Sequence, residues 1–140
     1  MYKEIESKDT AVCHLFLYCC FKDGVFPEGE LDFVAGKFAA LGMHETLNFK
    51  DEVIRFKAYK PNITDERDYL QYLITTIGSA NEAALFSYCV ELFLSDGQLD
   101  SSEDHLSETL GELLGITPNE QVFVKKMMVQ RKIVETQKFF

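Results

Sequence analysis

Acidic residues recur in this chain at a spacing that could bind a metal ion. Asp23 and Asp96 each precede a glycine, and Glu30 and Glu103 follow them by seven residues. Carboxylate oxygens are the ligands that calcium and magnesium prefer in proteins, and the glycine lets the chain turn between the two acids. We therefore consider a divalent-cation site in these two loops.

Each loop resembles the back half of a calcium-binding EF-hand loop, in which the aspartate and the later glutamate are both ligands. The front half is missing, because two of its ligand positions fall on Leu92 and Leu94 in the second loop. Calcium takes about six to eight oxygens, so neither loop alone predicts an EF-hand. A weaker site remains open if the loops approach each other or if further acids join the second one. The candidate ligands are Asp96, Glu103, Asp100, Asp104, Asp23 and Glu30, and the candidate ions are calcium, magnesium, manganese and zinc.

A structural interpretation explains the same residues. Gly24 and Gly97 follow apolar runs and can end a helix in the left-handed conformation without steric cost. If the chain turns at once, the preceding aspartate faces the free amides that open the next helix. The later glutamate then lies in that helix's first turn, where its charge is favourable. This interpretation needs no ligand, and the sequence leaves both open.

The negative charge of the chain is unevenly distributed. The net charge of −9 argues against nucleic-acid binding, which depends on clustered lysine and arginine. Asp104, Glu108 and Glu112 stand four residues apart, so their like charges repel along one helix face. The last helix, a partner's basic side chains or a cation could offset this charge. The sequence does not choose among these three. The final segment is basic, and for it we favour packing near the acidic helix over a nucleic-acid patch; its basic residues are Lys125, Lys126, Arg131, Lys132 and Lys138.

The composition indicates one globular cytoplasmic domain over residues 1–140. Hydrophobic residues make up 46% of the chain, which suffices for a core. The longest apolar run, residues 12–21, is too short to cross a bilayer, and the charged N-terminal segment is no signal peptide, so we expect no membrane insertion. We expect buried free thiols at all four cysteines, which lack disulfide-like spacing. They are Cys13, Cys19, Cys20 and Cys89.

Capping residues and glycine stops predict seven helices, and strand signals are nearly absent. The expected helices cover residues 10–22, 27–41, 49–59, 65–77, 80–94, 101–115 and 118 onward. The predicted caps are Asp9, Thr64, Ser79, Asp100 and Thr117, and the predicted stops include Gly42, Gly78 and Gly115.

The first and fifth expected helices are apolar on nearly all sides. Because such a helix has to be covered on all sides, we expect these two to pack as a central pair with the others around them. Each is followed by an Asp-Gly turn and, at a matching distance, by a Leu-Gly pair, which indicates a duplicated unit over residues 10–42 and 80–116. The predicted fold is an all-α orthogonal helical bundle of about seven helices with an internal pseudo-two-fold helix-turn-helix repeat.

This duplicated pattern resembles the TerB-like family, known from bacterial tellurite-resistance operons. Members carry an apolar helix, an Asp-Gly-x5-Glu turn, a second helix ending in Leu-Gly, and a second copy of that unit further along. The match covers residues 15–42 and 85–116. The resemblance implies an all-helical cytoplasmic module with a role in stress response, whose loop acids are proposed to bind metal. Lys22 replaces the small residue usual before the first aspartate, so the second loop is the better candidate.

Signatures of catalysis are weak. His14 adjoins Cys13, but neighbours on a helix do not face each other as a thiol nucleophile and its base must. His105 is more simply a solvated surface side chain, and Glu91 fits the core edge, paired with Lys, Arg or Tyr. We therefore expect a non-enzymatic interaction or stress-response sensor protein, with a protein partner or a homo-oligomer. The alternative is a divalent-metal-binding protein or metal-dependent enzyme that uses the acidic loops.

Overall fold

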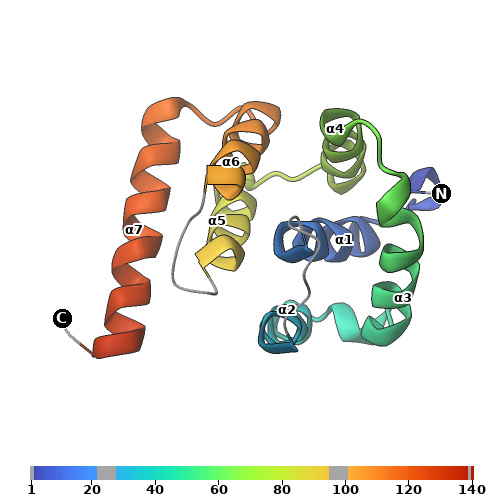
Figure 1. The fold of residues 1–140 in the computed structure, drawn as a ribbon, viewed down its shortest axis with the longest axis horizontal. Helices are drawn as coiled ribbons and strands as arrows, with labels where there is room; N and C mark the ends of the chain where they lie inside the picture. Colours follow the sequence, from blue (N-terminus) through green and yellow to red (C-terminus); the bar gives the residue numbers. More distant parts are fainter. Residues whose placement is uncertain (1, 22–27, 95–100, 139) are drawn as a thin grey trace. The chain divides into compact units, whose positions relative to one another are not determined.

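The computed structural model describes residues 2–21, 28–94, 101–138 and 140. These residues form seven α-helices and three short 3₁₀ turns, and none of them forms a strand (Figure 1). The predicted all-α helical bundle is confirmed. The chain divides into two compact units, Met1–Ser79 and Ala80–Phe140. The predicted single domain and internal repeat concern the relation between these units and stay predictions.

The first unit is built around α1 (Lys8–Phe21). This helix packs against α2 (Glu28–Ala40), α3 (Phe49–Tyr59) and α4 (Glu66–Ile77). Short 3₁₀ turns cover Tyr2–Glu4, Met43–Glu45 and Lys60–Asn62. Nearly every residue of α1 is buried, as its all-round apolar sequence requires.

The second unit contains α5 (Glu82–Phe93), α6 (Ser101–Leu113) and α7 (Pro118–Gln137). α5 packs against both of its neighbours, and α6 also contacts α7. α5 is therefore the helix that the other two helices of this unit both pack against. The expected packing of α1 against α5 stays a prediction.

At two helix starts, a residue close to the predicted cap takes its place. Ser7, not Asp9, caps α1: its Oγ accepts from the Thr10 amide at 3.1 Å. α4 is capped by Asp65 instead of Thr64, with Asp65 Oδ1 accepting from the Asp68 amide at 3.1 Å. Aspartate is the stronger N-cap, so the helix begins one residue later than Thr64 would allow.

The start of α5 is a third correction. The helix begins at Glu82 with Asn81 at the N-cap position, so the predicted capping box at Ser79 is wrong. Asn81 takes the N-cap position without a side-chain cap hydrogen bond. The predicted cap of α7 is confirmed, because Thr117 Oγ1 accepts from the Glu120 amide at 3.2 Å. The predicted cap Asp100 lies outside the described residues.

Other predictions of local structure are confirmed. α3 has the predicted bounds. The predicted helix stops have left-handed backbone, with φ of 76° at Gly42, 55° at Gly78 and 72° at Gly115. All four cysteines are buried and free. No helix in the described part of the chain is both long and apolar enough to cross a bilayer.

Candidate functional site

The predicted metal ligands fall where the structure gives no side-chain description. Asp23, Asp96 and Asp100 lie outside the described residues, and so do the side chains of Glu30, Glu103 and Asp104, whose backbone belongs to α2 and α6. Within the part of the chain that is described, no group of three or more His, Cys, Asp or Glu side chains could hold a metal ion. The divalent-cation site stays a prediction.

A continuous chain of polar side chains lies in the core of the first unit. His14 Nδ1 is 2.6 Å from the Tyr59 hydroxyl oxygen, and His14 Nε2 is 2.8 Å from Glu52 Oε1. The Tyr59 and Tyr69 hydroxyl oxygens are 2.7 Å apart. At the other end, Arg55 Nη1 donates to both carboxylate oxygens of Glu52, at 3.1 and 3.2 Å. We call these five residues the His14 cluster.

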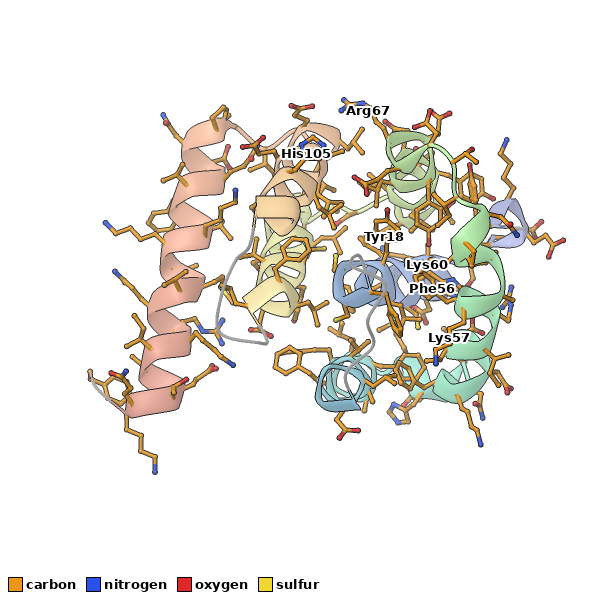
Figure 2. All side chains as sticks on the ribbon, viewed as in Figure 1. Tyr18, Phe56, Lys57, Lys60, Arg67 and His105 are labelled. Carbon is orange, nitrogen blue, oxygen red and sulfur yellow. The ribbon has the colours of Figure 1, made fainter. Side chains whose placement is uncertain are left out.

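The His14 cluster is assembled by three helices. α1 contributes His14 and α4 contributes Tyr69, while the other members come from α3. Glu52, Phe56 and Tyr59 share one face of α3, because they recur at helical spacing. Phe56 packs edge-on against the rings of His14 and Tyr59, with centroids 5.9 and 5.6 Å away, and lies on the side of α3 that faces α1 (Figure 2). The cluster therefore ties α1, α3 and α4 together.

One arrangement of protons satisfies the whole cluster. A neutral His14 with its proton on Nε2 donates to the Glu52 carboxylate, and its bare Nδ1 accepts from the Tyr59 hydroxyl. Tyr59 then accepts from Tyr69. If His14 gained a second proton, Nδ1 would also donate, and the Tyr59 hydroxyl could no longer donate to it.

Burial shifts the pKa values of His14, Tyr59 and Tyr69 so that all three side chains stay neutral, as this arrangement requires. Desolvation lowers the pKa of His14 below its ordinary 6.5, against the opposing hydrogen bond and charge of Glu52. Burial also raises the pKa of the Tyr59 and Tyr69 hydroxyls. Cys13 is buried nearby, and burial together with the Glu52 charge raises the pKa of its thiol to about 12. Its reactive thiolate form is therefore suppressed.

The geometry of the His14 cluster suits a structural role. A histidine oriented by a carboxylate is also the base of many hydrolytic sites. Here, however, the second imidazole nitrogen is engaged by Tyr59, and the exposed fraction of His14 is 0%. A substrate cannot reach a nitrogen that is both buried and bonded. A satisfied buried network of this kind fixes the packing of the elements that share it.

Tyr18 adds a neighbouring link between α1 and α4. Its hydroxyl donates to Glu66 Oε2 at 2.6 Å, and its ring lies 5.1 Å from that of Tyr69 (Figure 2). Burial and the Glu66 hydrogen bond raise the pKa of Tyr18. This second contact strengthens the seam between the two helices on the side next to the cluster.

Sequence reasoning missed the His14 cluster because its contacts join distant residues. His14 is 45 positions from Tyr59 and 38 from Glu52. Two signals could have found it. His14 interrupts an apolar run and therefore needs buried partners. Glu52 shares the apolar face of α3 with Phe56, which is unusual for a carboxylate without a partner.

A second notable feature is the exposed apolar surface of α7. Eight large hydrophobic side chains are exposed in the described part of the chain, and five of these lie on α7. They are Val122, Phe123, Met127, Val129 and Ile133. The buried residues of α7 are Gln121, Val124 and Met128, which share the opposite side. Within its unit, α7 is thus covered by α5 and α6 along one side only (Figure 1).

A row of apolar side chains with lysines runs along α7 on the side away from its two acids. Val122, Val129 and Ile133 form a row, because they follow one another by seven and four residues; Lys126 lies within the row and Lys132 beside it. We call these five residues the lysine face. Helical periodicity places both acids of α7, Glu120 and Glu135, on the other side.

Both acids have partners away from the lysine face. Glu120 Oε1 accepts from the Thr117 hydroxyl at 2.9 Å, and Glu135 Oε1 is 3.8 Å from Arg131 Nη2. Next to the lysine face, the end of α5 and the last turns of α7 enclose a hollow of about 230 Å³. It is lined by Leu94, Val129, Lys132, Ile133, Thr136 and Gln137.

Three sequence expectations about this unit are confirmed. α7 contacts the acidic α6, as the charge distribution predicts. Glu91 lies at the edge of the core and pairs with a basic residue, since Arg131 Nη1 is 3.8 Å from Glu91 Oε2. His105 is exposed. The charge distribution did not predict that Val122, Val129 and Ile133 are exposed, because buried apolar residues of α7 lie between them in the sequence.

The chain matches no protein-family model, no curated protein and no solved structure. Its class is therefore given by its own architecture, an all-α helical bundle. The TerB-like resemblance rests on the duplicated sequence pattern.

Proposed function

We propose that this chain is a non-enzymatic, TerB-like helical module that acts by binding another protein. The observation that carries the proposal is the gathering of exposed apolar side chains on α7. Single exposed apolar residues are normal on a protein surface, but five on one helix favour an interaction site. Phe123 exposes 66% of its surface and Val122 65%, so both are open to a partner.

The form of α7 supports this role. The helix has 20 residues and extends for about 30 Å at 1.5 Å per residue. Phe123 and Met127 lie one turn apart, and aromatic and methionine side chains are enriched in protein interfaces. A regular helix with apolar anchors one turn apart is a common way to bind a groove or another helix.

The His14 cluster favours binding over catalysis. Burial perturbs the pKa values of His14, Tyr59 and Tyr69 in this cluster, and perturbed pKa values in many proteins point to an active site. Its imidazole is sealed in the core and serves the packing of α1, α3 and α4. The TerB-like resemblance adds the expectation that the module works in stress response or sensing.

Site-specific photo-cross-linking in cells of the source organism tests the proposal. A benzoylphenylalanine group at position 123 should yield discrete cross-linked species heavier than the chain. The same group at Gln71, an exposed polar position on α4, is the matched control. Absence of any adduct from position 123, or the same adducts from both positions, would contradict an interaction surface on α7.

A further inference from the structure

We propose that the lysine face of α7 binds an acidic amphipathic helix of the partner protein, a conclusion that rests on the proposed binding function. The lysine face combines a row of apolar side chains with two cations and no carboxylate from α7. These features specify both the shape and the charge of the occupant.

The apolar row specifies the shape. Val129 and Ile133 expose 41% and 44% of their surfaces, and both also line the 230 Å³ hollow beside Leu94. A straight row on one helix, flanked by a recess, accepts a second helix whose own apolar residues recur every three or four positions. Apolar contact of this kind supplies affinity, because it removes area from water on both partners.

The two lysines specify the charge. Lys126 stands between Val122 and Val129, and Lys132 lines the hollow, so a docked helix would bring its flanking residues next to both ammonium groups. Acidic residues at those positions would form charge-assisted contacts, whereas basic residues would be repelled. The partner helix is therefore acidic beside its apolar stripe.

Other occupants fit the lysine face less well. In a second copy of this chain, α7 packed on α7 through this face would place lysines near lysines in either direction. A neutral helix would bury both cations without a counter-charge.

Selection from a displayed peptide library tests the inference with the full-length chain. The library encodes helix-forming peptides with apolar residues at helical spacing and with Glu, Lys, Gln or Ala at the other positions. Selected peptides should carry a surplus of Glu beside the apolar stripe. Their affinity should fall about tenfold in the Lys126→Glu, Lys132→Glu variant and also in Ile133→Glu. The matched control is Lys8→Glu, Lys50→Glu, which changes the net charge equally at two exposed positions that begin other helices.

The outcomes separate this inference from the proposed function. Selected peptides without a Glu surplus, equal losses in the control variant, or no selected binder would overturn the acidic helix. So would binding to phosphatidylserine vesicles that depends on Lys126 and Lys132, or a concentration-dependent dimer abolished by Ile133→Glu. In these cases cross-linking at position 123 can still identify a protein partner, and only its failure contradicts the binding function itself.

Discussion

The imidazole of His14 and the carboxylate of Glu52 form a buried pair, with 2.8 Å between Nε2 and Oε1. The pair joins α1 to α3, and both carboxylate oxygens of Glu52 also accept from Arg55. Because the imidazole is desolvated and its other nitrogen accepts from Tyr59, the neutral form of His14 fits the native fold. The stability of the first unit therefore depends on the protonation state of one histidine.

Lowering the pH should destabilise the protein through His14. Burial lowers the pKa of folded His14 below 6.5, so the unfolded chain binds this proton more readily. The stability that neutral His14 contributes to the fold is present above pH 6.5 and is lost as the pH falls through the pKa of His14 in the folded protein. Between the two values, the free energy of unfolding decreases by up to about 1.4 kcal/mol per pH unit.

Urea unfolding at a series of pH values measures this effect. His14→Gln removes the titrating group while keeping an amide that can donate to Glu52. The free energy of unfolding of this variant should fall less steeply below pH 6.5 than that of the wild type. His44→Gln, at an exposed position, is the matched control. If the free energy of unfolding falls equally with pH in His14→Gln and in the wild type, His14 is not the cause of the pH dependence.

Replacing Tyr59 by Phe should weaken the fold without opening a cavity. The change removes the hydroxyl that joins His14 to Tyr69, at 2.6 and 2.7 Å, and leaves two buried polar groups without this partner. We expect a loss of about 1–3 kcal/mol in the free energy of unfolding, the usual cost of an unsatisfied buried group. Chemical denaturation measures it.

Tyr2→Phe is the control for the tyrosine variant. Tyr2 packs its ring on Tyr69, with centroids 5.0 Å apart, so the control removes a hydroxyl from the same aromatic group outside the hydrogen-bonded chain. A Tyr59→Phe loss no larger than that of Tyr2→Phe would argue that the buried chain contributes little.

Gly111→Ala should destabilise the second unit. A methyl group at Gly111 would overlap the side chain of Gln121, which is buried and donates to the Ile116 carbonyl at 2.9 Å. Overpacking of this kind costs about 1–3 kcal/mol. Gly36→Ala is the control, because no atom lies within 4 Å of the added methyl group.

The two glycine variants should move in opposite directions. Gly36 lies inside α2, where alanine favours the helix by up to about 1 kcal/mol, so its variant should be as stable as wild type or more so. Thermal unfolding followed by circular dichroism distinguishes the two. A neutral Gly111→Ala would mean that Gln121 moves aside without losing its contacts.

The acidic loops make a separate prediction about metal. If Asp96 and Glu103 hold a cation, calcium, magnesium, manganese or zinc should raise the melting temperature saturably, because the ion binds the folded state. When the ion concentration is about a hundredfold above the dissociation constant, binding should increase the free energy of unfolding by about 2.7 kcal/mol. The double variant Asp96→Asn, Glu103→Gln should lose this stabilisation by the ion. The control variant Glu45→Gln, Asp51→Asn, which changes two exposed acids, should keep it. No stabilisation by any of these ions at millimolar levels would reject the metal hypothesis.

Local structure could be predicted because its causes are local. Thr117 caps α7 through the amide of Glu120, and Gly78 ends α4 in the left-handed conformation; both interactions span at most four residues. Where the prediction was wrong, two good caps competed within two residues, as with Ser7 and Asp9. The sequence shows both candidates but not which backbone turn the following packing prefers.

By itself, the sequence determined the helical class and most helix ends, because periodicity, caps and left-handed glycines act over a single turn. It also determined that α1 must be covered on all sides. Only the tertiary structure decided that His14 finds Glu52 and Tyr59, because those contacts join three helices through space. The same holds for α7: its lysines are visible in the sequence, but packing decides that Val122, Val129 and Ile133 lie on the uncovered side while Val124 and Met128 are buried.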